Sequence, residues 1–318
     1  HESSVTGQDE EKGGGAGICL KFSNTVIKNV IVRNNSGITT GCGIFCNDGN
    51  PHISNSLIIN NENPQASNLL YTRSGGGVYC SYDAHLTIEN TIICFNTNSI
   101  GGGICLAGFN DIFNPELTVV NSVIYENISP GIYNLGGGIA TYDETTLSVI
   151  NSLIWDNEGG NFSCDDPWLG VNVTINNNLD SCDAYGNLTM SPLFVSPALY
   201  DFSLDPDSPC IDAGDNNYVT SEFDFIHNYR IWDGNYDNDT IVDIGAYEYD
   251  SQFNPVGIIT NESKKIENIL VYPNPTKGFI NVDIDNVSRI EIYDNSSRLV
   301  FISNQSHFDI SKLKQGLY

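Results

Sequence analysis

The amino-acid sequence predicts an all-β protein whose larger part is a solenoid of short parallel strands, stacked coil upon coil. Three observations predict this fold: a glycine-rich box recurs along the first half of the chain, an asparagine-centred box recurs between the glycine boxes, and helical periodicity is missing. Short runs rich in Ile and Val lie between the boxes. Such a repeat buries its apolar side only by stacking on its neighbours, which predicts ladders of like residues.

The glycine box is the first repeated element. Its copies begin at Gly13, Gly41, Gly75, Gly101 and Gly136. Glycine reaches positive φ without steric cost and lets two backbones approach closely. We therefore expect the glycine boxes at one corner of each coil.

The asparagine box holds two asparagines, six residues apart. The first occurs at Asn29, Asn55, Asn90, Asn121, Asn151 and, where the pattern decays, Asn177; the second occurs at Asn35, Asn61, Asn96, Asn127 and Asn157. Asparagine tolerates left-handed backbone at a corner, and stacked amides hydrogen-bond from coil to coil. Differences in repeat length fall between the boxes, in residues 62–74, 107–116 and 128–135, as expected for loops on a constant scaffold.

The paired boxes resemble those of right-handed parallel β-helix proteins of the pectin-lyase-like group. The resemblance covers about residues 13–185 and implies a right-handed β-helix domain over residues 1–185.

Residues 186–250 follow with different motifs. Ser208–Gly214 reads SPCIDAG and Asp243–Glu248 reads DIGAYE. They resemble a terminal module found after β-helices in many secreted bacterial proteins. The middle element of that module keeps its acid at Asp224 and its base at Arg230, but lacks the usual glycine. We expect this module to cap the coils, because an open end leaves backbone groups unpaired.

The C-terminal part, residues 264–318, follows a polar linker at 251–263. Its YPNPTKG opening, Tyr272–Gly278, and its DISKLKQGLY ending, Asp309–Tyr318, are similar to the sorting domain of type IX secretion, a small β-sandwich. Ser296 and Ser297 replace the glycine of the central turn, and the chain stops before the family's last strands. The resemblance implies a partial β-sandwich, the type IX secretion machinery as partner, and a secreted or outer-membrane cell-surface protein.

Composition excludes several classes of function. The chain carries 39 acidic against 13 basic residues, a formal charge of −26, which argues against nucleic acid and anionic membrane surfaces as partners. No apolar stretch is long enough for a transmembrane segment. The only methionine is Met190, so we expect a fragment or a processed chain. Nine cysteines without a CxxC pair predict reduced core residues, with Cys46 and Cys80 close enough in adjacent coils for a disulfide.

Catalytic candidates are few. The aspartate motifs of pectinolytic hydrolases, which resemblance to this fold would imply, are missing. Asp165 and Asp166, beside Trp168, are the adjacent carboxylate pair of the coil region, and Arg73 is the best candidate for the base of a lyase. A solvated loop and a surface arginine with a snorkelling stem are the simpler interpretations.

Ligand candidates lie in the loops and turns. Aromatic side chains that either line a carbohydrate-binding face or cover apolar surface are Tyr71, Phe109, Phe113, Tyr133 and Trp168. Acids that follow the glycine boxes are Asp48, Asp83, Asp111, Asp143 and Glu144. Stacked in a column they would favour calcium, whereas the simpler interpretation is a set of solvated turn residues. No cofactor is required by these patterns, and calcium is the one they would favour.

The scaffold is complete in the sequence while a catalytic constellation is not. We therefore expect a secreted or cell-surface protein that binds polysaccharides, cell-surface glycans or other surfaces. The alternatives are a carbohydrate-active enzyme, either a calcium-dependent polysaccharide lyase or a glycoside hydrolase, and a structural spacer within a larger secreted chain.

Overall fold

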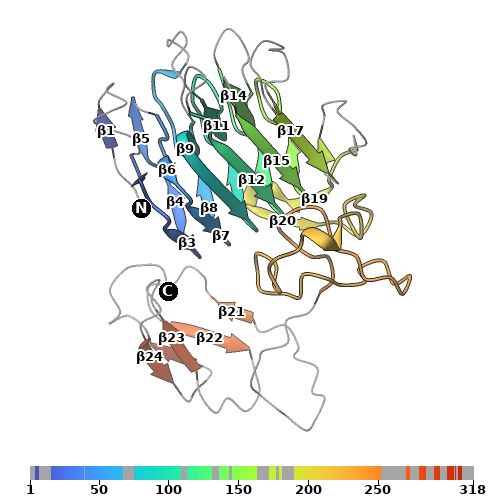
Figure 1. Cartoon of the computed structure of the whole chain (residues 1–318). Helices are drawn as coiled ribbons and strands as arrows, with labels where there is room; N and C mark the ends of the chain where they lie inside the picture. The colour runs from blue at the N-terminus through green and yellow to red at the C-terminus, as the bar shows by residue number, and fades with distance from the viewer. Residues whose placement is uncertain are drawn as a thin grey trace. The chain divides into compact units, whose positions relative to one another are not determined.

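The computed structural model describes two compact units, residues 1–254 and 255–318. The described residues are 4–6, 16–38, 40–66, 75–108, 113–130, 136–142, 145–162, 172–176, 179–180, 190–251, 270–272, 279–283, 290–293, 299–303, 305 and 307–309. Nearly all regular structure among them is β. In the first unit, strands of successive coils lie side by side and run parallel (Figure 1).

Two stacks of parallel strands share the long strand β9, Val78–Glu89. The first stack contains β2 (Ile18–Lys21), β6 (Ile44–Gly49), the first part of β9, β11 (Ile104–Ala107) and β14 (Ile139–Tyr142). The second contains β3 (Val26–Lys28), β7 (His52–Ser54), the second part of β9, β12 (Glu116–Val120), β15 (Thr146–Ile150) and β17 (Asn172–Asn176). Within β9 the chain turns at Tyr82, whose φ is 57°, so one strand serves both stacks.

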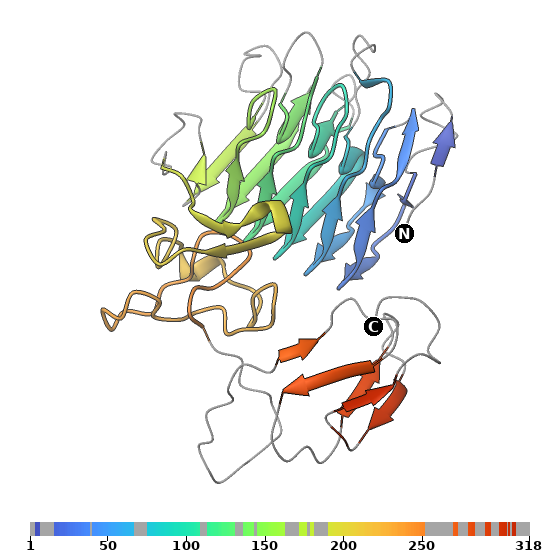
Figure 2. The same cartoon turned by 180° about the vertical axis from the view of Figure 1, so that it is seen from behind.

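The third stack is a separate parallel sheet. It contains β4 (Ile31–Arg33), β8 (Leu57–Ile59), β10 (Ile92–Cys94), β13 (Val123–Tyr125), β16 (Leu153–Trp155) and β18 (Leu179–Asp180). Beyond it, isolated parallel bridges continue the pairing between coils, and β1 (Ser4–Thr6) pairs with β5 (Ser36–Ile38). The prediction of an all-β parallel solenoid is confirmed, as both views show (Figures 1 and 2).

Inward-facing residues of the three stacks form one continuous apolar core. Its ladders include Ile44, Val78, Ile104 and Ile139 in the first stack, Ile53, Ile88, Val119 and Val149 in the second, and Val32, Ile58, Ile93, Ile124 and Ile154 in the third. Parallel in-register pairing places the same position of each repeat over its neighbour, which turns a sequence repeat into a column.

The two asparagines of each box have different roles. The first, Asn29, Asn55, Asn90, Asn121 and Asn151, takes φ between 45° and 56° at the corner between the second and third stacks. These five corner asparagines confirm the expected left-handed turn. The second forms the buried asparagine ladder.

Each rung of the asparagine ladder donates its amide to the next. The Nδ2–Oδ1 distances are 2.8 Å from Asn35 to Asn61 and 2.9 Å from Asn61 to Asn96, from Asn96 to Asn127 and from Asn127 to Asn157. Each Oδ1 also accepts the backbone N–H of the rung before it. Asn161, at the start of the following coil, takes the place of a further rung, since its Oδ1 accepts both the amide and the backbone N–H of Asn157.

The glycine boxes lie where one coil passes closest to the next. A Cβ on Gly77 would stand 2.7 Å from the carbonyl oxygen of Gly103 and 3.1 Å from Nδ2 of Asn96. Any larger residue there would push apart the coils and the ladder together. The box also supplies left-handed turns, with φ of 60° at Gly101 and 61° at Gly136.

Residues 190–251, the terminal segment, pack on the outer face of the third stack. Their regular elements are β19 (Phe194–Ser196), η2 (Pro197–Leu199), β20 (Asp201–Leu204) and η3 (Asn216–Tyr218). Phe202, Leu204 and Ile244 join Ile92 and Val123 in a second apolar cluster. The expected capping of the coil end is not tested by these lateral contacts and stays a prediction.

Corner asparagines hold the terminal segment to the coils. Asn55 and Asn90 donate to the carbonyl oxygens of Asp224 and Phe223 at 3.2 and 2.9 Å. Asn151 both donates to the carbonyl of Asp215, at 3.0 Å, and accepts its N–H, at 2.9 Å. Asn121 is fully buried between them, with no hydrogen-bond partner for either amide atom among the described residues.

The motifs of the terminal segment meet in a buried charged network. The Arg230 guanidinium donates to the carbonyl of Gly245, and its Nη1 lies 3.7 Å from Oε2 of Glu248. The Asp224 carboxylate accepts the N–H groups of Ile226, Asn228 and Glu248, and the Asp243 carboxylate accepts those of Asp212 and Tyr249.

Burial dominates the electrostatics of that network. It raises the pKa of Asp243 to about 7, despite the hydrogen bonds from Tyr249 and Asp212. Burial, followed by the charge of Asp243, raises the pKa of Glu248 well above its ordinary value. Three buried carboxyl groups around one guanidinium cannot all be charged cheaply, so at least one holds a proton near neutral pH.

The second unit contains antiparallel strands. β21 (Leu270–Tyr272), β22 (Phe279–Asp283) and β25 (His307–Asp309) form one sheet, and β23 (Ile290–Tyr293) with β24 (Leu299–Ser303) forms another. Two small antiparallel sheets agree with the predicted partial β-sandwich.

The described cysteines are free, and most are buried. Cys46 and Cys80 are register partners in the first stack, facing the core, without a disulfide between them. Burial raises the pKa of the Cys46 thiol to about 12. The expectation of reduced core residues is confirmed for Cys42, Cys46, Cys80, Cys94, Cys105 and Cys210, while Cys19 is exposed, and Cys164 and Cys182 lie outside the described residues.

Candidate functional site

The residues on either side of each ladder asparagine point outward. Alternation along the chain requires this, because the side chain between them is committed to the buried ladder. The row before the ladder is Asn34, Asn60, Phe95, Glu126 and Asp156, all with φ between 44° and 58°. The row after it is Ser36, Glu62, Thr97, Ile128 and Glu158, joined by parallel bridges. The two rows form the walls of a groove that runs across the coils.

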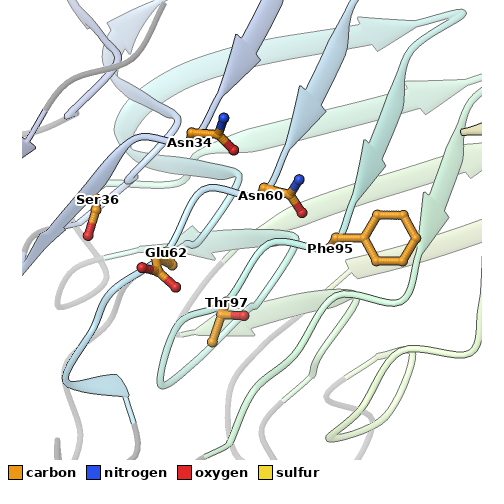
Figure 3. Close-up of a pocket in the computed structure, with 6 residues that line it drawn as sticks. All are labelled: Asn34, Ser36, Asn60, Glu62, Phe95 and Thr97. Atoms are coloured by element: carbon orange, nitrogen blue, oxygen red, sulfur yellow. The ribbon is translucent and has the colours of Figure 1, made fainter. Parts of the chain in front are cut away.

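The first part of the groove is a cleft of about 360 Å³. Figure 3 shows its lining residues in two rows, Asn34, Asn60 and Phe95 in one and Ser36, Glu62 and Thr97 in the other. Amides, hydroxyls and a carboxylate supply both donors and acceptors here, and the ring of Phe95 adds an apolar surface.

The second part of the groove continues from the other side of Phe95. This cleft, of about 320 Å³, is lined by Phe95, Glu126, Ile128, Asp156 and Glu158. Because Phe95 lines both clefts, it stands at the centre of the groove. The chemistry changes there from neutral hydrogen-bonding groups to carboxylates.

The terminal segment adds a second aromatic ring at this centre. Tyr200 lies 5.7 Å from Phe95 between ring centroids, in an edge-to-face arrangement, and its hydroxyl accepts a 3.4 Å hydrogen bond from Asn60. Phe95 also packs edge-to-face on Tyr125, at 6.0 Å. Tyr200 is 45% exposed and Phe95 is half-buried, so both rings are fixed by packing and still accessible.

The carboxylates of the groove have no basic partner. Glu62, Glu126, Asp156 and Glu158 form no ion pair with any described residue, and no described Lys, Arg or His lines either cleft. The Tyr125 hydroxyl donates to Oε1 of Glu126 at 2.7 Å. Burial, that hydrogen bond and the charges of Glu126 and Asp156 raise the pKa of Tyr125, which places this end of the groove in a negative field.

The predicted metal column is described in part. Asp48 and Asp83 lie in adjacent coils, and the Asp48 carboxylate accepts the backbone N–H of Asp83 at 3.3 Å. Asp48 is thus used, at least in part, as a turn acceptor. Among the described residues, no three His, Cys, Asp or Glu side chains gather in a way that could hold a metal ion.

The other predicted site residues fall mostly outside the described part of the chain. Phe113 is half-buried and packs on Tyr82, with ring centroids 5.0 Å apart, which agrees with its covering role. Those outside are Tyr71, Arg73, Phe109, Asp111, Tyr133, Asp143, Glu144, Asp165, Asp166 and Trp168. Their proposed roles stay predictions.

The groove was missed in the sequence because its residues share a position and little chemistry. Asn60, Phe95 and Glu126 are equivalent, yet they read as an amide, a ring and an acid. The signal that could have found them is their place, one residue before a predicted ladder asparagine. Tyr200 has no such signal, since the repeat does not extend to the terminal segment.

Comparisons with known proteins identify the C-terminal part. Residues 270–318 match the family model described as the secretion system C-terminal sorting domain. This supports the predicted type IX sorting signal and its secretion machinery as partner, and it indicates a secreted or cell-surface protein. Neither the curated proteins nor the solved structures gave a match. In the described part of the chain, no helix has the length and apolar character needed to cross a membrane.

Proposed function

We propose that the coils of this secreted or cell-surface protein bind a glycan chain in the groove beside the asparagine ladder. The observation that carries the proposal is the pair of accessible rings, Phe95 and Tyr200, fixed against one another in a groove lined with amides and hydroxyls. Sugar rings present an apolar C–H face that packs on aromatic rings, and hydroxyls that pair with amides and carboxylates.

The shape of the groove supports a chain rather than a single sugar. Its lining positions repeat once per coil, because every coil contributes one residue before and one after its ladder asparagine. An extended ligand lying across the coils would meet a new pair of side chains at each coil. The rigid ladder beneath preorganises these contacts, which lowers the entropy lost on binding.

The test replaces Phe95 with the residue that the same column carries in earlier coils. Phe95→Asn suits the left-handed backbone, because Asn34 and Asn60 adopt it at equivalent positions. Tyr82→Asn is the matched control, an aromatic at a left-handed corner that does not line the groove. Binding to a panel of immobilised polysaccharides is measured for all three proteins. We expect Phe95→Asn to weaken binding about tenfold or more and Tyr82→Asn to leave it unchanged.

Two results would contradict the proposal. One is a panel in which the unaltered protein retains no polysaccharide. The other is equal weakening by both substitutions with matching losses of melting temperature, because that would trace the effect to the fold.

A further inference from the structure

The strongest unassigned feature of the groove is its charge. Glu126, Asp156 and Glu158 line one cleft together, and Glu62 lines the adjoining one. Like charges held on one wall repel each other, and a ligand that brings positive charge relieves that repulsion. A ligand that brings carboxylates or sulfates adds to it.

From this arrangement we infer that the groove selects glycans with free amino groups, over their N-acetylated and uronate counterparts. The inference rests on the proposed glycan binding and names its ligand class. Each protonated amine would lie near the carboxylates, while the sugar faces pack on Phe95 and Tyr200. An ammonium near a ring face gains a further cation–π attraction.

The hydrogen bonding of Glu126 strengthens the inference. Its Oε1 accepts the Tyr125 hydroxyl at 2.7 Å, which favours the ionised carboxylate. That hydrogen bond also holds the carboxylate in place, at a row position next to Phe95. Charge and ring are therefore presented together, where an amino sugar could use both.

The formal charge of the whole chain acts in the same direction. At −26, it attracts polycations and repels polyanions over a distance set by the salt concentration. Long-range attraction alone would not distinguish one acidic face from another, so the test must separate the groove from the rest of the surface.

The experiment measures binding of four oligosaccharides of equal length to the full chain by calorimetry. They are a glucosamine oligomer, its N-acetylated form, a neutral glucose oligomer and a galacturonate oligomer. We expect the glucosamine oligomer to bind about tenfold more tightly than its N-acetylated form, and the galacturonate oligomer not to bind. In about 1 M salt, where the Debye length falls to ~3 Å, the difference between the first two should largely vanish.

Variants assign the selectivity to the groove. Glu126→Asn uses a residue suited to the left-handed backbone of its row, and it should reduce the preference for the amine several-fold without abolishing binding of the neutral oligomer. Glu116→Gln is the control, because Glu116 is exposed on the second stack, 3.3 Å from His85, and lines neither cleft. It should leave the preference unchanged.

The outcomes separate this inference from the proposed function. Equal binding of the aminated and acetylated oligomers, still lost in Phe95→Asn, would overturn the selectivity and leave glycan binding in place. A preference lowered equally by Glu126→Asn and Glu116→Gln would also overturn it, since the whole surface would then be responsible. Failure of every oligomer to bind would count against the proposed function itself.

Discussion

The coil stack and the terminal segment both bury polar side chains, and they do so with opposite chemistry. In the coils, the asparagine ladder from Asn35 to Asn157 is neutral, and each amide pairs with the next. In the terminal segment, Asp224, Asp243 and Glu248 surround the single guanidinium of Arg230, whose Nε and Nη1 have no hydrogen-bond partner among the described residues. The difference teaches that a neutral, repeating network gives stability independent of pH, while a charged, non-repeating one ties stability to protonation.

The largest effect is expected in the ladder. Asn61→Ala removes the acceptor of the Asn35 amide and backbone N–H, and the donor to Asn96, all in buried positions. Each orphaned group costs about 1–3 kcal/mol, so the free energy of unfolding should fall by about 3 kcal/mol or more. Urea unfolding of the full chain measures it.

The chain contains a matched control for that substitution. Asn50 donates its backbone N–H and its amide to Oδ1 of Asn24, at 2.7 and 3.3 Å, in the same coil-to-coil geometry but on the exposed surface. Water replaces the lost partner there, so Asn24→Ala should change stability by only about 0.5 kcal/mol or less. Equal losses in the two variants would mean that burial of the ladder is not the source of its contribution.

The second effect concerns pH. The pKa of Asp243 is raised to about 7 in the folded state, so between the unfolded and folded pKa values the folded chain binds more protons. The stability of the first unit should therefore decrease as pH rises, by about 2 kcal/mol between roughly pH 5 and pH 8. Unfolding curves at the two pH values test the sign and the size of the change.

Glu248→Gln sharpens this prediction. It removes one buried charge and keeps an oxygen to accept the backbone N–H of Asp243. The pH dependence should become shallower, because Asp243 then loses a repelling neighbour and its pKa falls. A steeper dependence, or stability that rises with pH in the unaltered chain, would show that the charged network does not control it.

The smallest effect tests the seam between the two regions. Asn151 exchanges two hydrogen bonds with Asp215, whereas Asn121 makes none with the described residues. Glycine suits the left-handed backbone of both. Asn151→Gly should therefore cost about 1–2 kcal/mol and Asn121→Gly clearly less, both measured as shifts in urea midpoint. Equal costs would place a hidden partner, such as an ordered water, at Asn121.

Much of the coil architecture could be predicted because each coil repeats the same physical requirement. Asn90 and Asn96 could be assigned to a corner and a ladder from spacing alone, as could Gly77 to a close approach. The hydroxyl column beside the corner was missed, although Ser56, Thr91, Ser122 and Ser152 hydrogen-bond in series along it. These residues follow each corner asparagine directly, so the signal was present in the sequence.

The candidate site could not be predicted in the same way. Its central contact joins Phe95, in the repeat, to Tyr200, more than a hundred residues later and outside it. No period relates the two, and the contact depends on how the terminal segment packs against the third stack. The acids chosen from the sequence lay after the glycine boxes, whereas the acids of the groove, such as Glu126, lie beside the ladder.

The asparagine ladder is also polar along its length. Every amide donates in the same direction, from Asn35 toward Asn161, so the side-chain dipoles add head to tail as peptide dipoles do in an α-helix. The positive end of this column lies toward the later coils. Glu126, Asp156 and Glu158 flank the ladder at that end, as acidic side chains favour the first turn of a helix. The scaffold thereby lowers the electrostatic cost of gathering carboxylates at one end of the groove.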